Sequence, residues 1–65
     1  MNTMGEAIKK RRGVLNITQR ELADIAGVGI NTLTKIERGE ANPSLRVLKS
    51  ILDALGLEIT ITIKQ

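Results

Sequence analysis

The sequence has no cysteine, no histidine and no aromatic residue among its 65 residues. Without thiol or imidazole side chains, a disulfide framework and a zinc or transition-metal site of the usual kind are excluded. Catalysis is disfavoured as well, because the acidic residues are scattered and no glycine-rich phosphate loop is present. We therefore expect no enzyme, no metal and no cofactor, and a core built from aliphatic residues and methionine.

Long apolar runs are also absent. No run reaches the length of about 18 residues that a membrane helix needs, and no basic leader precedes an apolar signal segment. Together with the short length, this predicts one small cytoplasmic domain without a membrane partner. Ten Lys and Arg against seven Asp and Glu give a net charge of +3. This charge suits a polyanionic partner but is compatible with many other proteins.

Two short helical patterns lie within residues 18–39. Thr18 followed by Glu21 is a capping box and predicts a helix start, and Gly27 suits the left-handed residue that ends a helix. A second helical pattern then runs to Gly39. The expected apolar positions are Leu22, Ala23, Ile25 and Ala26 in the first helix and Leu33 and Ile36 in the second. Two helices joined by a short turn that contains glycine are typical of a helix-turn-helix, a DNA-reading unit.

Several strings of the sequence resemble the helix-turn-helix family of Cro and the phage repressors: T-Q-R-E-L-A, A-G-V-G-I-N-T-L-T-K-I-E-R-G and N-P-S-L. The resemblance covers roughly residues 4–56 and implies a mainly α, four-helix, lambda-repressor-like DNA-binding domain. It also implies that Arg12 pairs with Glu37, which would make both residues structural. Gly29 departs from the family, which usually has Ser or Thr there to cap the second helix of the motif.

The polar face of the second helix supplies the candidate base contacts. The amide of Asn31 suits adenine, and Lys35 can donate to guanine or to a phosphate. Thr34 can do either. Ile30 has two equally supported interpretations, a core position or an apolar contact with a thymine methyl group. The predicted base contacts are Ile30, Asn31, Thr34 and Lys35.

Phosphate contacts are expected at helix starts and in the basic run K-K-R-R. Gln19 begins the first helix of the motif, where its amide and the exposed N–H groups suit a phosphate. The basic run has a solvated helical face as its alternative. The predicted phosphate contacts are Lys9, Lys10, Gln19, Thr32, Asn42 and Arg46. For Thr32, Asn42, Ser44 and Arg46, a plain surface or capping role is the favoured alternative.

Two further helices flank the motif. Thr3 and Glu6 predict a helix from Met4 to about Leu15, which Asn16 ends. Its inner side should carry Ala7, Ile8, Arg11 and Leu15. Asn42 as cap and Pro43 as first residue predict a fourth helix that runs to about Ala54, with Gly56 after it. Its apolar arc is wider than one small monomer needs to cover, and consists of Leu45, Leu48 and Leu52 extended by Val47, Ile51 and Leu55.

The pattern changes to period two in residues 57–64, which predicts a β-strand. One strand has no ladder of its own, so we expect it to pair antiparallel with the same strand of a second copy; a frayed tail is the alternative. We expect a helix-turn-helix domain at 1–56 and a dimerisation strand at 57–65. The predicted dimer interface consists of Val47, Ile51, Leu55, Leu57, Ile59, Ile61 and Ile63.

These patterns predict a sequence-specific transcription repressor that binds a palindromic operator in double-stranded DNA as a homodimer. The ending L-G-L-E-I-T-I is similar to HipB-like antitoxin regulators, which dimerise through such a strand. That similarity adds a toxin protein as an expected partner in an antitoxin role. The alternative is a protein-binding module with the same fold and no specific DNA binding, against which the positive outer face of the second motif helix argues.

Overall fold

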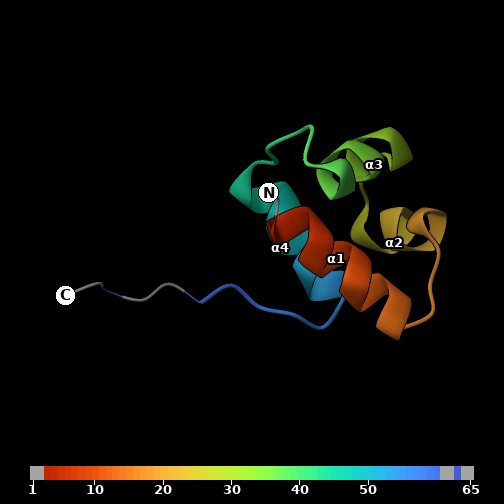
Figure 1. Ribbon diagram of the computed structural model, residues 1–65, viewed down its shortest axis with the longest axis horizontal. Helices are drawn as coiled ribbons and strands as arrows, with labels where there is room; N and C mark the ends of the chain where they lie inside the picture. The colour runs from red at the N-terminus through yellow and green to blue at the C-terminus, as the bar shows by residue number, and fades with distance from the viewer. Residues whose placement is uncertain (1–2, 61–62, 64–65) are drawn as a thin grey trace.

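The computed structural model describes residues 3–60 and Ile63, and the described residues contain helices but no strand. None of these helices combines the length and the apolar character of a membrane span. The fold is mainly α, as predicted, with the helix-turn-helix formed by the second and third helices. The helices are α1 (Thr3–Val14), α2 (Gln19–Ala26), α3 (Ile30–Arg38) and α4 (Leu45–Ala54) (Figure 1).

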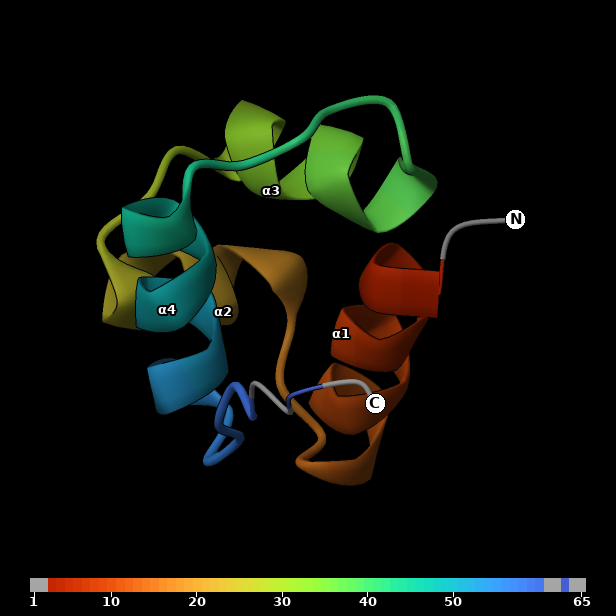
Figure 2. The same cartoon turned by 90° about the vertical axis from the view of Figure 1, so that its left-hand side faces the viewer.

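The third helix packs against two other helices. It contacts both α1 and α2, and α2 also contacts α4. Figure 2 shows α1 and α4 on either side of the molecule, with α3 across one end. Each of the four helices contributes to one aliphatic core, and Leu55, which directly follows α4, completes it. The core residues are Ile8, Leu22, Ala23, Leu33, Ile36, Ile51 and Leu55.

Local hydrogen bonds explain where the helices of the motif begin and end. Thr18 Oγ1 accepts from the backbone N–H of Glu21 at 3.0 Å, and the Glu21 carboxylate accepts from the N–H of Thr18 at 2.8 Å. This capping box is the one predicted from the sequence. Gly27 and Gly39 end α2 and α3 with φ of 72° and 78°, a left-handed conformation that glycine adopts without strain.

One apolar position of α2 was predicted wrongly. Ile25 was expected in the buried stripe, but its side chain is 63% exposed. The buried arc of this short helix is centred between Leu22, Ala23 and Ala26, and Ile25 lies beyond its edge.

The first helix begins at Thr3, one residue before the predicted start, and ends at Val14. Asn16 follows it with a φ of 57°, as its role in ending the helix requires. The prediction that Ala7 and Leu15 face inward was wrong, because both are exposed. The inner line instead follows Gly5, Ile8 and Arg12, three and then four residues apart.

The fourth helix starts later than predicted. Ser44 caps it by accepting from the N–H of Val47 at 3.2 Å, so the helix begins at Leu45. The Asn42 cap and Pro43 start were therefore wrong, since the Ser44 hydroxyl supplies the capping acceptor two residues further on. Leu45 is 66% exposed although it was expected in the apolar stripe.

Two predicted interface residues belong to the core of the single chain. Ile51 and Leu55 are 0% and 1% exposed. Their expected place at a dimer interface is wrong, because their side chains are already covered by the other helices. The apolar arc of α4 therefore serves mainly this core, and the part of it left over is smaller than the sequence pattern indicated.

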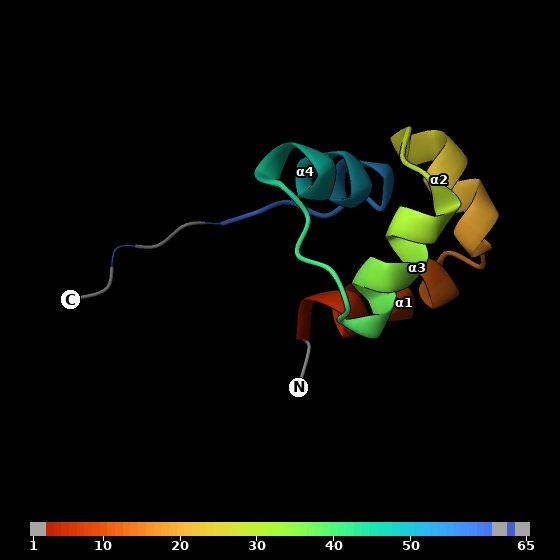
Figure 3. The same ribbon diagram turned by 90° about the horizontal axis from the view of Figure 1, so that it is seen from above.

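The chain leaves the helices after α4 (Figures 1 and 3). Residues 57–60 have no regular secondary structure in the single chain. Ile61, Thr62 and Lys64, which complete the predicted strand, lie outside the described residues. A strand that pairs only with a second copy is not tested by one chain, so it stays a prediction.

Candidate nucleic-acid interface

The third helix has a buried face and a polar face. Leu33, Ile36 and Glu37 are buried. Asn31, Lys35 and Arg38 are exposed, and their spacing of four and then three residues places them on one side of the helix. The outward side of α3 therefore presents one amide and two cations.

An ion pair fixes the buried face of α3. Arg12 Nε donates to Glu37 Oε2 at 2.9 Å, and Arg12 Nη2 donates to Glu37 Oε1 at 3.1 Å. This pair, which the family resemblance implied, joins α1 to α3. The Glu37 side chain is only 2% exposed, so the bidentate contact with Arg12 compensates for its removal from water. The hydrogen bonds and the nearby charge of Glu37 raise the pKa of Arg12 against the opposing effect of desolvation.

Gln19 extends this ion pair into α2. Its Nε2 donates to Glu37 Oε1 at 3.0 Å, and its Oε1 accepts from Thr34 Oγ1 at 3.3 Å. The sequence predicted a phosphate contact for Gln19, whereas the structure gives its amide two partners inside the protein. One amide hydrogen and the backbone N–H at the helix start remain as donors for a phosphate. Arg12, Gln19, Thr34 and Glu37 are called the anchor network below.

The hydroxyl of Thr34 points its hydrogen into the protein. Thr34 Oγ1 donates to the carbonyl of Ile30 at 2.8 Å and also lies within hydrogen-bond distance of Gln19 Oε1. A hydroxyl has one hydrogen and two acceptor lone pairs. Because the hydrogen is shared between two acceptors of the protein, a ligand at this half-buried residue meets an acceptor.

The basic run splits into two structural and two exposed residues. Arg11 Nε donates to the carbonyl of Leu55, the residue that caps the end of α4, at 3.0 Å. Arg12 belongs to the anchor network. Lys9 and Lys10 are both exposed and remain candidates for phosphate contact. The hydrogen bond of Arg11 was not predicted, because its partner is 44 residues away and no local sequence pattern indicates it.

The other predicted contacts are spread over three elements. Thr32, Asn42 and Arg46 are exposed on α3, on the loop after it and on α4. Ile30 is partly buried and packs against the core, which favours the core interpretation. Arg38 was left out of the predicted contacts although its spacing from Asn31 and Lys35 was a usable signal.

Comparison with known proteins identifies the family. A helix-turn-helix family model matches residues 8–61. The immunity repressor protein of Bacillus phage phi105 is 38% identical over 58 residues, which cover 89% of this chain and 40% of that repressor. The cryptic phage CTXphi transcriptional repressor RstR of Vibrio cholerae is 35% identical over 54 residues, which cover 83% of this chain and 48% of that protein.

An archaeal relative is covered more fully. An uncharacterized HTH-type transcriptional regulator of Methanothermobacter thermautotrophicus is 40% identical over 55 residues, which cover 85% of this chain and 80% of that protein. The chain thus spans less than half of the two phage repressors but most of this regulator. On the family match over most of its length and on these relatives, the chain belongs to the helix-turn-helix family.

Proposed function

We propose that the chain is a sequence-specific transcriptional regulator, a repressor, that places α3 in the major groove of double-stranded DNA. The observation that carries this proposal is the arrangement of α3, whose inner face is fixed by the anchor network while Asn31, Lys35 and Arg38 face outward. An α-helix fits the major groove, where base edges can be distinguished. Two relatives that are named repressors support the proposal.

Each exposed residue of the interface has a role that its chemistry suggests. Asn31 can form two hydrogen bonds with adenine, and Lys35 can donate to guanine. Phosphate contacts orient the helix without reading sequence. For these we propose Lys9, Lys10, Gln19, Thr32, Asn42 and Arg46, with Arg38 added on the strength of its exposure. The anchor network would keep these groups at fixed positions, because α3 is tied to both α1 and α2.

The regulator would act as a homodimer on a palindromic operator. Two recognition helices must lie about 34 Å apart to meet successive major grooves on one side of the duplex. Self-pairing of the segment after α4 would supply the two-fold axis, and its exposed isoleucines support that pairing. The interface proposed after correction consists of Val47, Leu57, Ile59, Ile61 and Ile63.

Selection of duplexes from a random pool, followed by gel-shift titration at two salt concentrations, tests the proposal. We expect an enriched palindromic sequence whose affinity exceeds that for unrelated duplexes by roughly a thousandfold or more. A salt dependence should appear with both kinds of duplex, because phosphate contacts are shared. Equal affinity for selected and unrelated DNA would instead favour the protein-binding module.

An antitoxin role is a narrower proposal, supported by the ending L-G-L-E-I-T-I. In that role the cytoplasmic regulator would also bind a toxin encoded beside it. Co-purification of the chain with the product of the neighbouring reading frame tests this. Failure to co-purify would leave a repressor without a toxin partner.

A further inference from the structure

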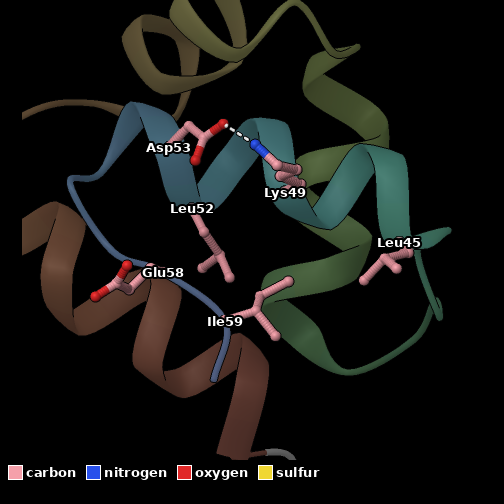
Figure 4. A pocket seen from close by; sticks show the side chains of 6 residues that line it. All are labelled: Leu45, Lys49, Leu52, Asp53, Glu58 and Ile59. Atoms are coloured by element: carbon pink, nitrogen blue, oxygen red, sulfur yellow. Dashed lines mark hydrogen bonds and ion pairs between the residues drawn. The ribbon is translucent and has the colours of Figure 1, made fainter. Parts of the chain in front are cut away.

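An apolar groove lies beside the point where the chain leaves α4. It has a volume of about 380 Å³, and Figure 4 shows side chains from α4 and from the segment after it around this space. Leu45, Leu52 and Ile59 are its apolar residues, and the hydrogen bond of 2.9 Å from Lys49 to Asp53 lies at its edge. The lining residues are Leu45, Lys49, Leu52, Asp53, Glu58 and Ile59.

Large aliphatic side chains are exposed at this groove and just after it. Leu45 is 66% exposed, Ile59 is 39% exposed and Ile63 is 86% exposed. Exposed apolar residues that gather at a groove indicate a surface that another protein covers. The groove is lined by two acidic residues, Asp53 and Glu58, and by one basic residue, Lys49.

We propose that the C-terminal strand of a second copy covers this groove, in an antiparallel register centred on Ile61. The inference rests on the proposed homodimer and specifies its pairing. In this register Glu58 lies opposite Lys64 of the second copy, and Ile59 lies opposite Ile63 of the second copy. Directly opposite residues of antiparallel strands point to the same side of the sheet.

Charge complementarity selects this register. Glu58 and Lys64 are the only charged residues of the segment 57–65, and each dimer would contain their pair twice. A register centred on Thr60 places Glu58 opposite Thr62, and a register centred on Thr62 places Lys64 opposite Thr60. Both alternatives keep Ile61 opposite another isoleucine but lose the two ion pairs, and the register centred on Thr62 also places Ile59 opposite Gln65. Opposite charges directly across a sheet stabilise the pairing, typically by about 0.2–1 kcal/mol for each pair.

The occupant is a second copy because the chain cannot place its own Ile63 opposite its own Ile59. Such a hairpin would need a turn at Thr60, Ile61 and Thr62. These residues are all β-branched and favour extended backbone, and none of them is a glycine, proline, asparagine or aspartate of the kind that tight turns use. A symmetric partner needs no turn at all.

The absence of native cysteine makes cross-linking a clean test of the register. Single variants Thr60→Cys, Ile61→Cys and Thr62→Cys of the full chain are oxidised mildly without DNA. We expect Ile61→Cys to form a covalent dimer, because a residue on the two-fold axis lies about 4.5–5.5 Å from its copy. The two threonine variants should stay monomeric on denaturing gels, since their copies would lie roughly 7–8 Å apart on a diagonal.

Mixed samples extend the test to the groove. Ile59→Cys mixed with Ile63→Cys should give a heterodimeric disulfide, whereas each variant alone should not. A dominant cross-link of Thr60→Cys or Thr62→Cys would overturn the register. Absence of every cross-link, together with a monomer in sedimentation, would overturn the self-pairing itself.

Charge exchange provides an independent measurement. Glu58→Lys or Lys64→Glu alone should raise the dimer dissociation constant roughly three- to thirtyfold, and the double variant should restore it to within about twofold. In the groove, Leu45→Glu should weaken the dimer by roughly tenfold or more, because a charge would be buried there. Ile25→Glu is the matched control, since Ile25 is similarly exposed on α2 and does not line the groove.

The outcomes separate this inference from the proposed function. A cross-linked Ile61→Cys dimer that binds no DNA would sustain the register and reject the regulator. Specific DNA binding by a chain that never cross-links at Ile61 would do the reverse. An effect of Leu45→Glu on binding to another protein, with the dimer unchanged, would assign the groove to that protein and overturn the inference.

Discussion

The Glu37 carboxylate is almost completely buried and accepts two hydrogen bonds from Arg12. Arg12 Nη1 also donates to the carbonyl of Ile17 at 3.0 Å, so the guanidinium group holds the turn before α2 as well. One arginine therefore connects α1, the start of the helix-turn-helix and α3. This arrangement makes the orientation of α3 depend on a pair of opposite charges.

Removal of one charge of this pair should be costly. Arg12→Met leaves the Glu37 carboxylate buried without its cationic partner, so we expect the free energy of unfolding to fall by about 3 kcal/mol. Arg12→Met combined with Glu37→Leu should cost clearly less than the sum of the single changes. Urea denaturation of the four proteins of this cycle measures the coupling. Independent losses of about 0.5 kcal/mol or less would show two unlinked surface charges.

Base reading should depend on the outward side chains of α3. We expect Asn31→Ala and Lys35→Ala to weaken operator binding by about 1–3 kcal/mol each, with the helical circular dichroism unchanged. The loss should be larger for the operator than for unrelated duplexes. An equal loss on all DNA would show that the two residues contact phosphates only.

Lys9 and Lys10 should affect binding in a different way. Lys9→Gln or Lys10→Gln should weaken binding to all duplexes alike and reduce the slope of log affinity against log salt by about 0.9 for each phosphate that the lysine neutralises. Gel shifts at several salt concentrations provide the slope. An unchanged slope would return both lysines to a solvated helical face.

The inward hydroxyl hydrogen of Thr34 predicts a preference at one base. As an acceptor, Thr34 can pair with the amino group of adenine or cytosine but not with the carbonyl of thymine or guanine. Selection with Thr34→Val, which has nearly the same shape, should lose that preference at one symmetric pair of positions. Thr34→Ser is the control and should retain it. A wild-type preference for guanine or thymine there would mean that the hydroxyl donates to DNA.

Two glycines should respond oppositely to serine. Gly29 caps α3 with a φ of −69° and no side-chain hydrogen bond, and an added Cβ would meet only Thr32 Oγ1 at 3.7 Å. Gly29→Ser should therefore stabilise the fold by about 0.5–1 kcal/mol. Gly27→Ser should destabilise it, since its φ is 72°. Thermal unfolding of both variants decides this, and a loss of stability for Gly29→Ser would contradict it.

Local chemistry explains which parts of the fold were predictable. The capping box of Thr18 and Glu21 and the left-handed glycines Gly27 and Gly39 act within a few residues, so the sequence shows them directly. The cap at Ser44 was missed because Asn42 and Pro43 offered an equally reasonable start two residues earlier. The packing of the helix decides between two adjacent capping residues, and a local sequence pattern does not show that packing.

The errors at the candidate site have a different origin. Gln19 was expected to meet a phosphate, because from sequence alone its amide had no visible partner, yet Glu37 and Thr34 are 18 and 15 residues away. Ile51 and Leu55 were assigned to a dimer because their spacing on α4 shows an apolar face but not what covers it. The pair of Arg12 and Glu37 was found only through the family resemblance.

The hydrogen bond from Arg11 to the carbonyl of Leu55 has a mechanical consequence. It fastens the end of α4, where the chain departs toward the proposed two-fold axis, to the same helix that carries Arg12. In the proposed dimer each recognition helix lies about 17 Å from the two-fold axis, half of the spacing between major grooves. A rotation of the helical domain by about 10° about that axis would move the recognition helix by about 3 Å, close to one base-pair step. The stiffness of this joint would thus set how strictly the regulator measures the distance between half-sites.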